Sequence, residues 1–134
     1  MLEPGLNGGR ALRILVVEDN VDSADSLNLL LRLYGHEVQV ARTGHTALEM
    51  ALAFRPDLVL LDIGLPGMDG YQVAKHLREK PEFKDVMLCA LTGFTPSEAD
   101  RQRQQETGFN HYYIKPVSLT TLLELFETVG AKKS

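Results

Sequence analysis

The sequence has only one cysteine, no long apolar run and no block of basic residues, and each absence excludes a class of protein. A single thiol cannot form an internal disulfide, and Cys89 lies in an apolar run where cysteine is usually a small buried side chain. No segment approaches the ~18 consecutive apolar residues of a membrane span, and the N-terminus lacks the basic-then-apolar order of a signal peptide. We therefore expect a domain in the cytoplasm, or the cytoplasmic part of a membrane-bound protein, with no membrane contact of its own.

The charge distribution argues against direct nucleic-acid binding. The net charge is −4, and no block of basic residues occurs beyond Lys132-Lys133, so nothing forms a patch for a phosphate backbone. The 134 residues suffice for one domain, and 44% hydrophobic with 24% charged residues is typical of a soluble globular protein. One compact domain is expected.

Five short apolar runs predict β-strands. The first, third and fourth are apolar at nearly every position, which is typical of parallel strands covered on both faces by helices. The predicted strands span residues 13–17, 37–41, 58–62, 86–91 and 111–114.

Segments with apolar residues at helical spacing lie between and after these runs. The fourth has the clearest start, because Thr95 as cap, Pro96 at the first helical position and Glu98 three residues after the cap match a capping box. Gly130 is expected to close the last helix. The predicted helices span residues 22–34, 46–54 and 71–79, a segment that begins at Thr95, and 118–129.

This alternation of strands and helices predicts a three-layer α/β domain with a parallel sheet and right-handed crossovers. Residues 1–10 contain several glycines and a proline and are expected to be a flexible lead-in. The domain is expected to span residues 11–130, with a short tail at 131–134. Functional groups in such folds lie at the carboxyl ends of the strands.

Four of the predicted strands end in side chains that can do chemistry. Glu18 and Asp19 follow the first strand, and Asp62 ends the third. Thr92 follows the fourth strand and Lys115 the fifth. Crowded carboxylates need raised pKa values or a bound cation, and an all-oxygen cluster suits a hard ion such as Mg²⁺. The sequence therefore predicts a site for a metal ion and a phosphate group.

Each of these residues alone has a simpler interpretation, as a solvated carboxylate, a threonine bonded to nearby backbone, or a surface lysine. Together they are harder to explain as an inert domain with an acidic rim. Other phosphate-handling folds fit less well. A flavin site needs a Ser/Thr/Gly-rich loop where Glu18 and Asp19 stand, and a phosphatase of the haloacid dehalogenase type needs an aspartate at Gly64.

The strand ends belong to four motifs: Ile14-Leu15-Val16-Val17-Glu18-Asp19-Asn20, Leu61-Asp62-Ile63-Gly64-Leu65-Pro66-Gly67-Met68-Asp69-Gly70, Leu91-Thr92-Gly93 and Lys115-Pro116. In order and spacing these motifs resemble the receiver domain of bacterial two-component response regulators, and the likeness covers about residues 12–129. The resemblance implies the doubly wound, flavodoxin-like strand order 2-1-3-4-5.

The resemblance implies that Asp62 takes a phosphoryl group from a phosphohistidine on a histidine kinase or a histidine phosphotransfer domain. Asp19, Asp62 and the backbone carbonyl of Gly64 would bind Mg²⁺ or Mn²⁺ directly, with Glu18 acting through water. The metal ion and Lys115 would stabilise the phosphoryl oxygens during transfer. The domain would catalyse its own phosphorylation and dephosphorylation without acting on an outside substrate.

The resemblance also implies a conformational switch. Thr92 would turn toward the phosphoryl group, and the aromatic residue three positions before Lys115, which is Tyr112 and not Tyr113, would fill the vacated space. The peptide bond between Lys115 and Pro116 is expected to be cis. The fourth helix, fifth strand and fifth helix would then bind a downstream protein or form a phosphorylation-dependent dimer.

Two positions that vary within the family predict a long phosphoryl lifetime. Neither Gly64 nor Phe94 can position an attacking water through its side chain, and Phe94 can shield the phosphorus. Gly93 has no side chain to block an incoming group.

The remaining alternative is a receiver fold that works as an interaction module without phosphorylation. Such domains usually lose the acceptor, the metal-binding carboxylate or the lysine, and all three are present here. We expect the chain to be either the receiver of a hybrid sensor histidine kinase or a stand-alone regulator.

Overall fold

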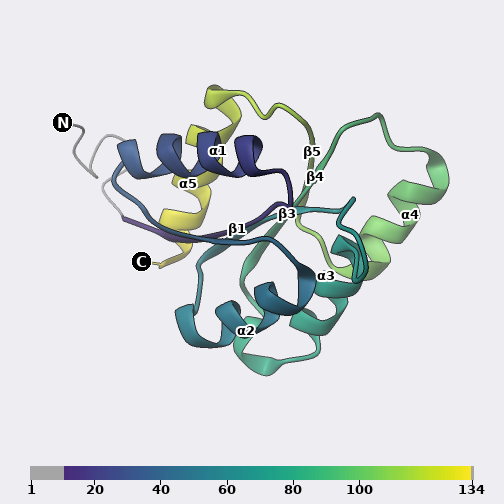
Figure 1. The fold of residues 1–134 in the computed structure, drawn as a ribbon. Helices are drawn as coiled ribbons and strands as arrows, with labels where there is room; N and C mark the ends of the chain where they lie inside the picture. The colour runs from purple at the N-terminus through teal and green to yellow at the C-terminus, as the bar shows by residue number, and fades with distance from the viewer. Residues whose placement is uncertain (1–10, 134) are drawn as a thin grey trace.

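The structure, a computed structural model, describes residues 11–133, so the expected lead-in at residues 1–10 lies outside the described residues. Within that range, strands and helices alternate along the chain (Figure 1). The strands are β1 (Arg13–Val17), β2 (Glu37–Ala41), β3 (Leu58–Asp62), β4 (Met87–Thr92) and β5 (His111–Ile114). The helices are α1 (Val21–Leu33), α2 (Gly44–Phe54), α3 (Gly70–Arg78), the 3₁₀ helix η2 (Pro81–Phe83), α4 (Glu98–Thr107) and α5 (Leu119–Lys133).

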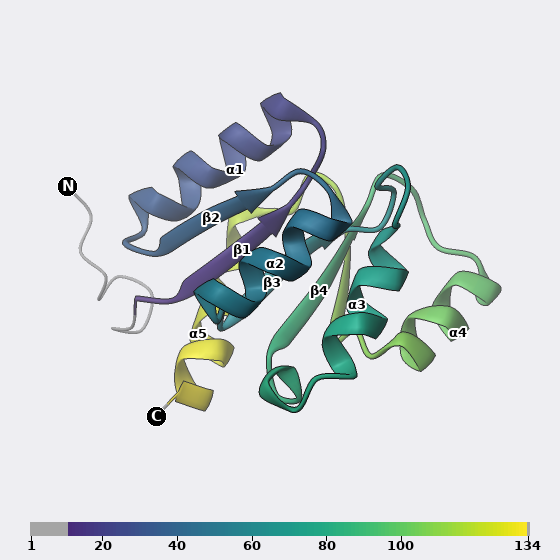
Figure 2. The same cartoon turned by 60° about the horizontal axis from the view of Figure 1, so that its bottom comes forward.

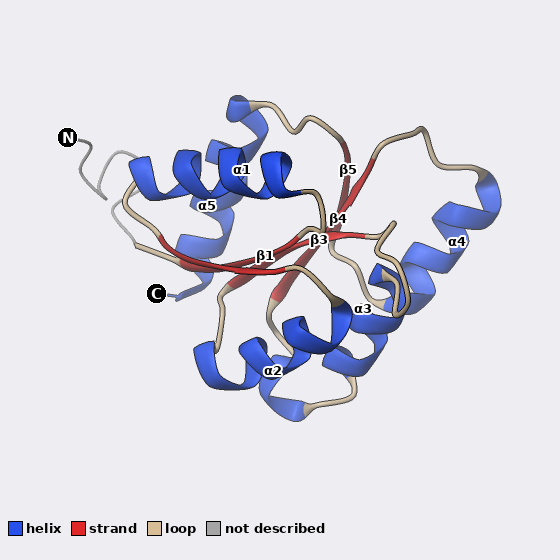
Figure 3. Cartoon of the chain, viewed as in Figure 1, coloured by secondary structure: helices blue, strands red, loops and turns tan. Residues whose placement is uncertain are grey.

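The strands form one parallel sheet in the order β2-β1-β3-β4-β5, which confirms the predicted topology (Figure 3). The register aligns the carboxyl ends of the strands. Asp62 at the end of β3 lies opposite Leu91 of β4. Thr92, the next residue of β4, lies opposite Ile114, which directly precedes Lys115. The sheet therefore brings the predicted functional residues to one edge.

The central strands β1, β3 and β4 are buried at nearly every position, because helices cover both faces of the sheet. Figures 1 and 2 show α1 and α5 on one face and α2 and α3 on the other. Alternate residues of each strand point to opposite faces, so Ile14 and Val16 pack with α1 and α5, whereas Leu15 and Val17 pack with α2 and α3. None of the helices that the structure describes is long and apolar enough to span a bilayer.

Cys89 lies in the middle of β4 and is fully buried in the cluster beneath α1 and α5. Burial raises the pKa of its thiol to about 12, because the thiolate form would lose its solvation. The thiol is therefore protonated and acts as a packing residue, as the sequence predicted.

The predicted start of the fourth helix is wrong. The cap of α4 is Ser97, whose hydroxyl accepts from the Asp100 N–H (3.1 Å) while Asp100 accepts from the Ser97 N–H (2.9 Å). Thr95 and Pro96 stay outside the helix. Two capping patterns overlap here, and the one that forms is the Ser97–Asp100 capping box, in which each side chain accepts from the other residue's N–H.

The predicted end of the last helix is also wrong, since α5 continues through Gly130 to Lys133. Glycine costs about 1 kcal/mol relative to alanine in a helix interior. Gly130 is buried, however, and its neighbours Phe126 and Val129 pack into the core. Packing therefore outweighs the propensity of glycine to end a helix.

Among the α-helices of residues 11–133, α4 has the fewest buried residues. Its sequence is strongly polar, and Gln104 is its only buried residue. The side-chain nitrogen of Gln104 has no hydrogen-bond partner among residues 11–133. Figure 2 shows α4 beside α3, at the outer side of the molecule. The helix thus contributes little to the core.

The last turn of α3 holds a partly buried arginine, Arg78, that no sequence pattern marks. The guanidinium of Arg78 donates to the carbonyl oxygens of Phe83 (2.8 Å), Val86 (2.9 Å) and Gly108 (2.9 Å from Nη2), and to the side-chain oxygen of Asn110 (2.7 Å). These acceptors belong to the segment before β4 and to the turn between α4 and β5. Arg78 therefore joins the end of α3 to the segment that follows it and to the turn after α4, where Gly108 is 30 positions away.

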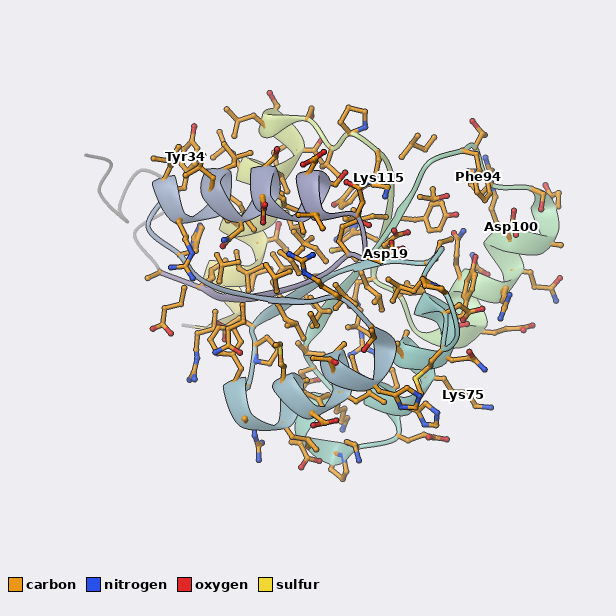
Figure 4. The ribbon with its side chains drawn as sticks, in the orientation of Figure 1. Asp19, Tyr34, Lys75, Phe94, Asp100 and Lys115 are labelled. Carbon is orange, nitrogen blue, oxygen red and sulfur yellow. The ribbon has the colours of Figure 1, made fainter. Side chains whose placement is uncertain are left out.

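We expect Arg78→Lys to lower the free energy of unfolding by about 3 kcal/mol, because a lysine ammonium cannot reach acceptors spread around a planar fork. Urea denaturation at neutral pH measures this change. Lys75 projects from the exposed side of the same helix (Figure 4), so Lys75→Gln is the control and should stay within about 0.5 kcal/mol of the wild type. An Arg78→Lys protein as stable as the control would contradict this account of the arginine.

Candidate functional site

The predicted functional residues meet at the carboxyl edge of the sheet. Three of the strands that position them, β1, β3 and β4, are buried in the core, and Lys115 follows the edge strand β5, which pairs with β4. Figure 4 shows Asp19 and Lys115 at this edge, and Phe94 on the segment that leads to α4. The structure thus brings together groups that lie up to 97 positions apart in the chain.

Three carboxyl groups form a cluster. One oxygen each of Glu18, Asp19 and Asp62 lies within 4.8 Å of the other two. Glu18 and Asp62 are only 3% and 7% exposed, whereas Asp19 is exposed. Two of the carboxyl groups are thus sheltered from water, and the third closes the cluster on the solvent side.

Lys115 supplies the positive charge next to this cluster. Its Nζ lies 2.8 Å from Oε1 of Glu18 and 3.3 Å from Oδ2 of Asp62. Burial alone would lower the pKa of Lys115, but the hydrogen bond to Glu18 and the charges of both carboxylates outweigh it and raise the pKa above its ordinary value. The ammonium group is therefore charged at neutral pH.

Backbone N–H groups orient the two buried carboxylates. The N–H of Asn20 donates to Oε2 of Glu18 (3.2 Å), and the N–H of Gly64 donates to Oδ1 of Asp62 (2.9 Å). Burial, and then the neighbouring Asp62 carboxyl, raise the pKa of Glu18, although Lys115 and the Asn20 N–H partly oppose this shift. A cation placed next to Glu18 would therefore oppose this rise and favour its charged form.

The donor set fits a hard cation. Three carboxylates and one ammonium leave two uncompensated negative charges in a partly buried space, and all the available ligand atoms are oxygen. Magnesium and similar ions prefer this chemistry. The cluster therefore has the composition that the sequence predicted for a metal site, with Gly64 close enough to contact Asp62 through its N–H.

Thr92 lies at the end of β4 with 1% of its surface exposed. Its hydroxyl accepts a hydrogen bond from the Phe94 N–H (3.4 Å), so it currently bonds to nearby backbone. A Cβ placed on Gly93 would meet nothing within 4 Å, and Phe94 is 63% exposed. This side of the site is open to solvent apart from the Phe94 ring.

The two adjacent tyrosines of β5 face opposite sides, as alternation requires. Tyr112 packs with Ile63, and its hydroxyl is buried near Thr92. Tyr113 packs on the other face and stacks with His111, with ring centroids 5.8 Å apart. Tyr112 is therefore the tyrosine of β5 that lies beside Thr92. The following Lys115-Pro116 peptide is cis.

The loop from Asp62 to α3 depends on residues whose roles the sequence analysis did not assign. A Cβ on Gly70 would lie 2.5 Å from Cα of Ile63, so only glycine allows the start of α3 to pack against the end of β3. Asp69 caps α3 in a capping box with Gln72. The Asp-x-x-Gln spacing was the signal that could have located this helix start.

Known proteins share both the sequence pattern and the fold. Residues 14–127 match the family model of the response regulator receiver domain. DivK, a polar-differentiation response regulator of Brucella anthropi, is 32% identical over 115 residues, which cover 86% of this chain and 93% of DivK.

Solved structures give the same result. The chemotaxis protein CheY4 of Vibrio cholerae has a TM-score of 0.82 at 28% identity, and the match covers 90% of this chain and 99% of CheY4. The receiver domain of the sensor histidine kinase PA1611 from Pseudomonas aeruginosa has a TM-score of 0.80 at 30% identity, with the same two coverages. That structure has a magnesium ion coordinated in its active site cleft.

Proposed function

Because this chain belongs to the response regulator receiver domain family, we propose that it accepts a phosphoryl group on Asp62 from the phosphohistidine of a histidine kinase or phosphotransfer domain. The observation that carries the proposal is the position of Lys115, whose Nζ contacts both Glu18 and Asp62 within the carboxylate cluster. An inert acidic rim would have no need of a partly buried ammonium that contacts two of its carboxylates. The wider role is that of a two-component signalling domain.

In the proposed transfer, a carboxylate oxygen of Asp62 forms a bond to phosphorus while the P–N bond of the phosphohistidine breaks. The imidazole leaves with the electron pair and takes up a proton. The N–H of Gly64 holds one oxygen of Asp62 in place, and Lys115 faces the other. Positioning and charge, with no outside substrate, account for the chemistry.

A metal ion is proposed to complete the site. Asp19, Asp62 and the carbonyl of Gly64 would hold Mg²⁺ or Mn²⁺, with Glu18 bound through water. The ion would supply positive charge for the phosphoryl oxygens. The all-oxygen cluster and the magnesium ion in the PA1611 receiver support this assignment.

The signal is proposed to leave through α4, β5 and α5. Thr92 would exchange its bond to the Phe94 N–H for one to a phosphoryl oxygen, and Tyr112 would respond to the change. Ile114 and Leu119, on β5 and α5, are 47% and 41% exposed, so this face offers apolar contacts. Its partner is a downstream protein or a second copy of the chain.

The similar proteins include a response regulator matched over 93% of its length and the receiver of a sensor histidine kinase. We accordingly propose either a stand-alone regulator or the receiver of a hybrid kinase. A cytoplasmic location fits both, because the phosphohistidine donors of such systems act there.

Direct phosphorylation tests the proposed function. Purified protein is incubated with acetyl phosphate and Mg²⁺ and its intact mass is measured. One added phosphoryl group per chain is expected, and none when EDTA replaces Mg²⁺. Absence of an adduct in both conditions would favour the alternative, a receiver fold that acts as an interaction module without phosphorylation.

We expect Phe94→Glu to shorten the phosphoryl lifetime about tenfold, because a carboxylate there can position the attacking water that the phenyl ring excludes. Phe94 is exposed, so the change should not disturb the fold. Loss of the adduct is followed by mass spectrometry after removal of the donor. Phe94→Leu, which stays apolar, is the control and should keep the wild-type lifetime. Equal lifetimes for the glutamate and leucine variants would reject the shielding role.

A further inference from the structure

Two tyrosine hydroxyls are buried together without hydrogen-bond partners. Tyr71, in the first turn of α3, and Tyr112, on β5, belong to one apolar cluster with Ile63, Ala90 and Phe109. Within residues 11–133, neither hydroxyl has a partner that satisfies hydrogen-bond geometry. Buried polar groups are nearly always paired, so two unpaired hydroxyls in one cluster call for an explanation.

The ring of Tyr71 is held from two sides. Phe109 contacts it edge-on, with centroids 6.0 Å apart and an interplanar angle of 77°. The guanidinium of Arg103, on α4, lies 4.0 Å from the ring centroid, and the same group reaches Asp69 at 3.6 Å. Since Asp69 caps α3, these contacts tie the position of the Tyr71 ring to both helices.

The hydroxyl of Tyr112 lies near two other hydroxyl groups, those of Thr92 and Tyr71. Burial raises the pKa of Tyr112, the Thr92 hydroxyl partly lowers it, and the Tyr71 hydroxyl raises it again. The Tyr112 ring is therefore in its inward position, with its hydroxyl between the end of β4 and the start of α3. A hydrogen bond between the two phenols would remove both unpaired buried groups at once.

We propose that Tyr71 is a positioning residue for the switch: its hydroxyl pairs with Tyr112 in the inward position, and its ring transmits that position to α4 through Arg103. The inference deepens the proposed function, on which its signalling role rests. The pairing itself needs no phosphorylation. Tyr71 thus sets how much of the inward state exists before any signal arrives.

Loss of the Tyr71 hydroxyl should shift the inward-to-outward ratio of Tyr112 about fivefold toward the outward state, which corresponds to about 1 kcal/mol. Tyr71→Phe keeps the ring, and with it the contacts to Phe109 and Arg103. The matched control is Tyr113→Phe, which removes a hydroxyl from the neighbouring position on the opposite face of β5.

Fluorine NMR of protein labelled with 3-fluorotyrosine measures that ratio, since the chain has only four tyrosines. The Tyr112 resonance is followed in the wild type, Tyr71→Phe and Tyr113→Phe proteins, without ligand and with Mg²⁺ and trifluoroberyllate as a phosphoryl mimic. A fivefold shift in Tyr71→Phe alone supports the proposal. An unchanged ratio, or an equal shift in both variants, overturns it.

A double-mutant cycle gives a second test, because it measures the coupling between the Tyr71 and Tyr112 hydroxyls. Two residues that only support the fold independently would show no such coupling. Tyr71→Phe, Tyr112→Phe and the double variant are unfolded in urea. Coupling of about fivefold in the unfolding constant is expected, whereas additive effects contradict direct pairing. If trifluoroberyllate binds none of the proteins, the proposed phosphorylation fails, but the ligand-free ratio and the cycle still decide the role of Tyr71.

Discussion

An Asp62→Asn protein is expected to fold normally and to take up at least about a hundredfold less phosphoryl group than the wild type. The amide is nearly isosteric with the carboxylate and can still accept the hydrogen bond from the Gly64 N–H, which is 2.9 Å long in the wild type. It lacks the negative oxygen that attacks phosphorus. It also removes one of three crowded carboxylates, so the free energy of unfolding should not fall. Mass spectrometry after acetyl phosphate treatment measures uptake, and urea denaturation measures stability.

The matched control is Asp69→Asn, in the loop that follows the acceptor. Asparagine caps a helix about as well as aspartate, so the capping of α3 should survive. This variant should be phosphorylated like the wild type. Wild-type uptake by Asp62→Asn would mean that another carboxylate in the cluster is the acceptor, with Asp19 the first candidate because it is exposed.

A Lys115→Ala protein is expected to accept a phosphoryl group but to lose about tenfold or more of the coupling between the site and the α4, β5 and α5 face. Lys115 directly follows β5 and contacts Asp62. A hydrogen bond from Lys115 to the new phosphoryl oxygens would therefore change the position of that strand. A charge-assisted hydrogen bond is strong enough for a coupling of this size. The fluorine resonance of Tyr112, with and without trifluoroberyllate, reports the loss.

The same variant should alter the pH dependence of stability. Without Lys115, Glu18 stays buried beside Asp62 with no counter-charge, so its pKa, already above the ordinary 4.5, rises further. The folded state then binds a proton more readily than the unfolded state, and the free energy of unfolding falls as pH rises above 4.5, more steeply than in the wild type. Lys84→Ala, at an exposed position, is the control. Lys115 would have no role in the mechanism if the Lys115→Ala protein kept the wild-type response of the Tyr112 resonance to trifluoroberyllate. It would also have to keep the wild-type pH dependence of the free energy of unfolding.

The sheet and the main site residues could be predicted because their signals are local. Apolar runs specify the buried strands, and the carboxyl-end rule then places Asp62 and Lys115 at one edge without any knowledge of side-chain contacts. The family resemblance, which points to the residue three positions before Lys115, separated Tyr112 from Tyr113, and alternation along the strand agreed with it.

The remaining features depend on contacts between distant segments. Arg78 reaches Gly108 and Asn110, some 30 positions away, and nothing in the sequence around it marks such a residue. Gly130 stays helical because of what packs around it, which no propensity scale includes. Tyr71 looks like an ordinary core aromatic until its hydroxyl is found beside that of Tyr112.

The polar character of α4 has a consequence for how the molecule can open. A helix that buries only Gln104 adds little apolar burial to global stability, so local unfolding of α4 is far less costly than unfolding of the sheet. Arg78 fixes the turn just beyond its C-terminal end, and the Ser97–Asp100 capping box holds its N-terminal end. Helix α4 and the segment that links it to Thr92 can thus rearrange together at a lower cost in free energy than the sheet, whose core stays intact.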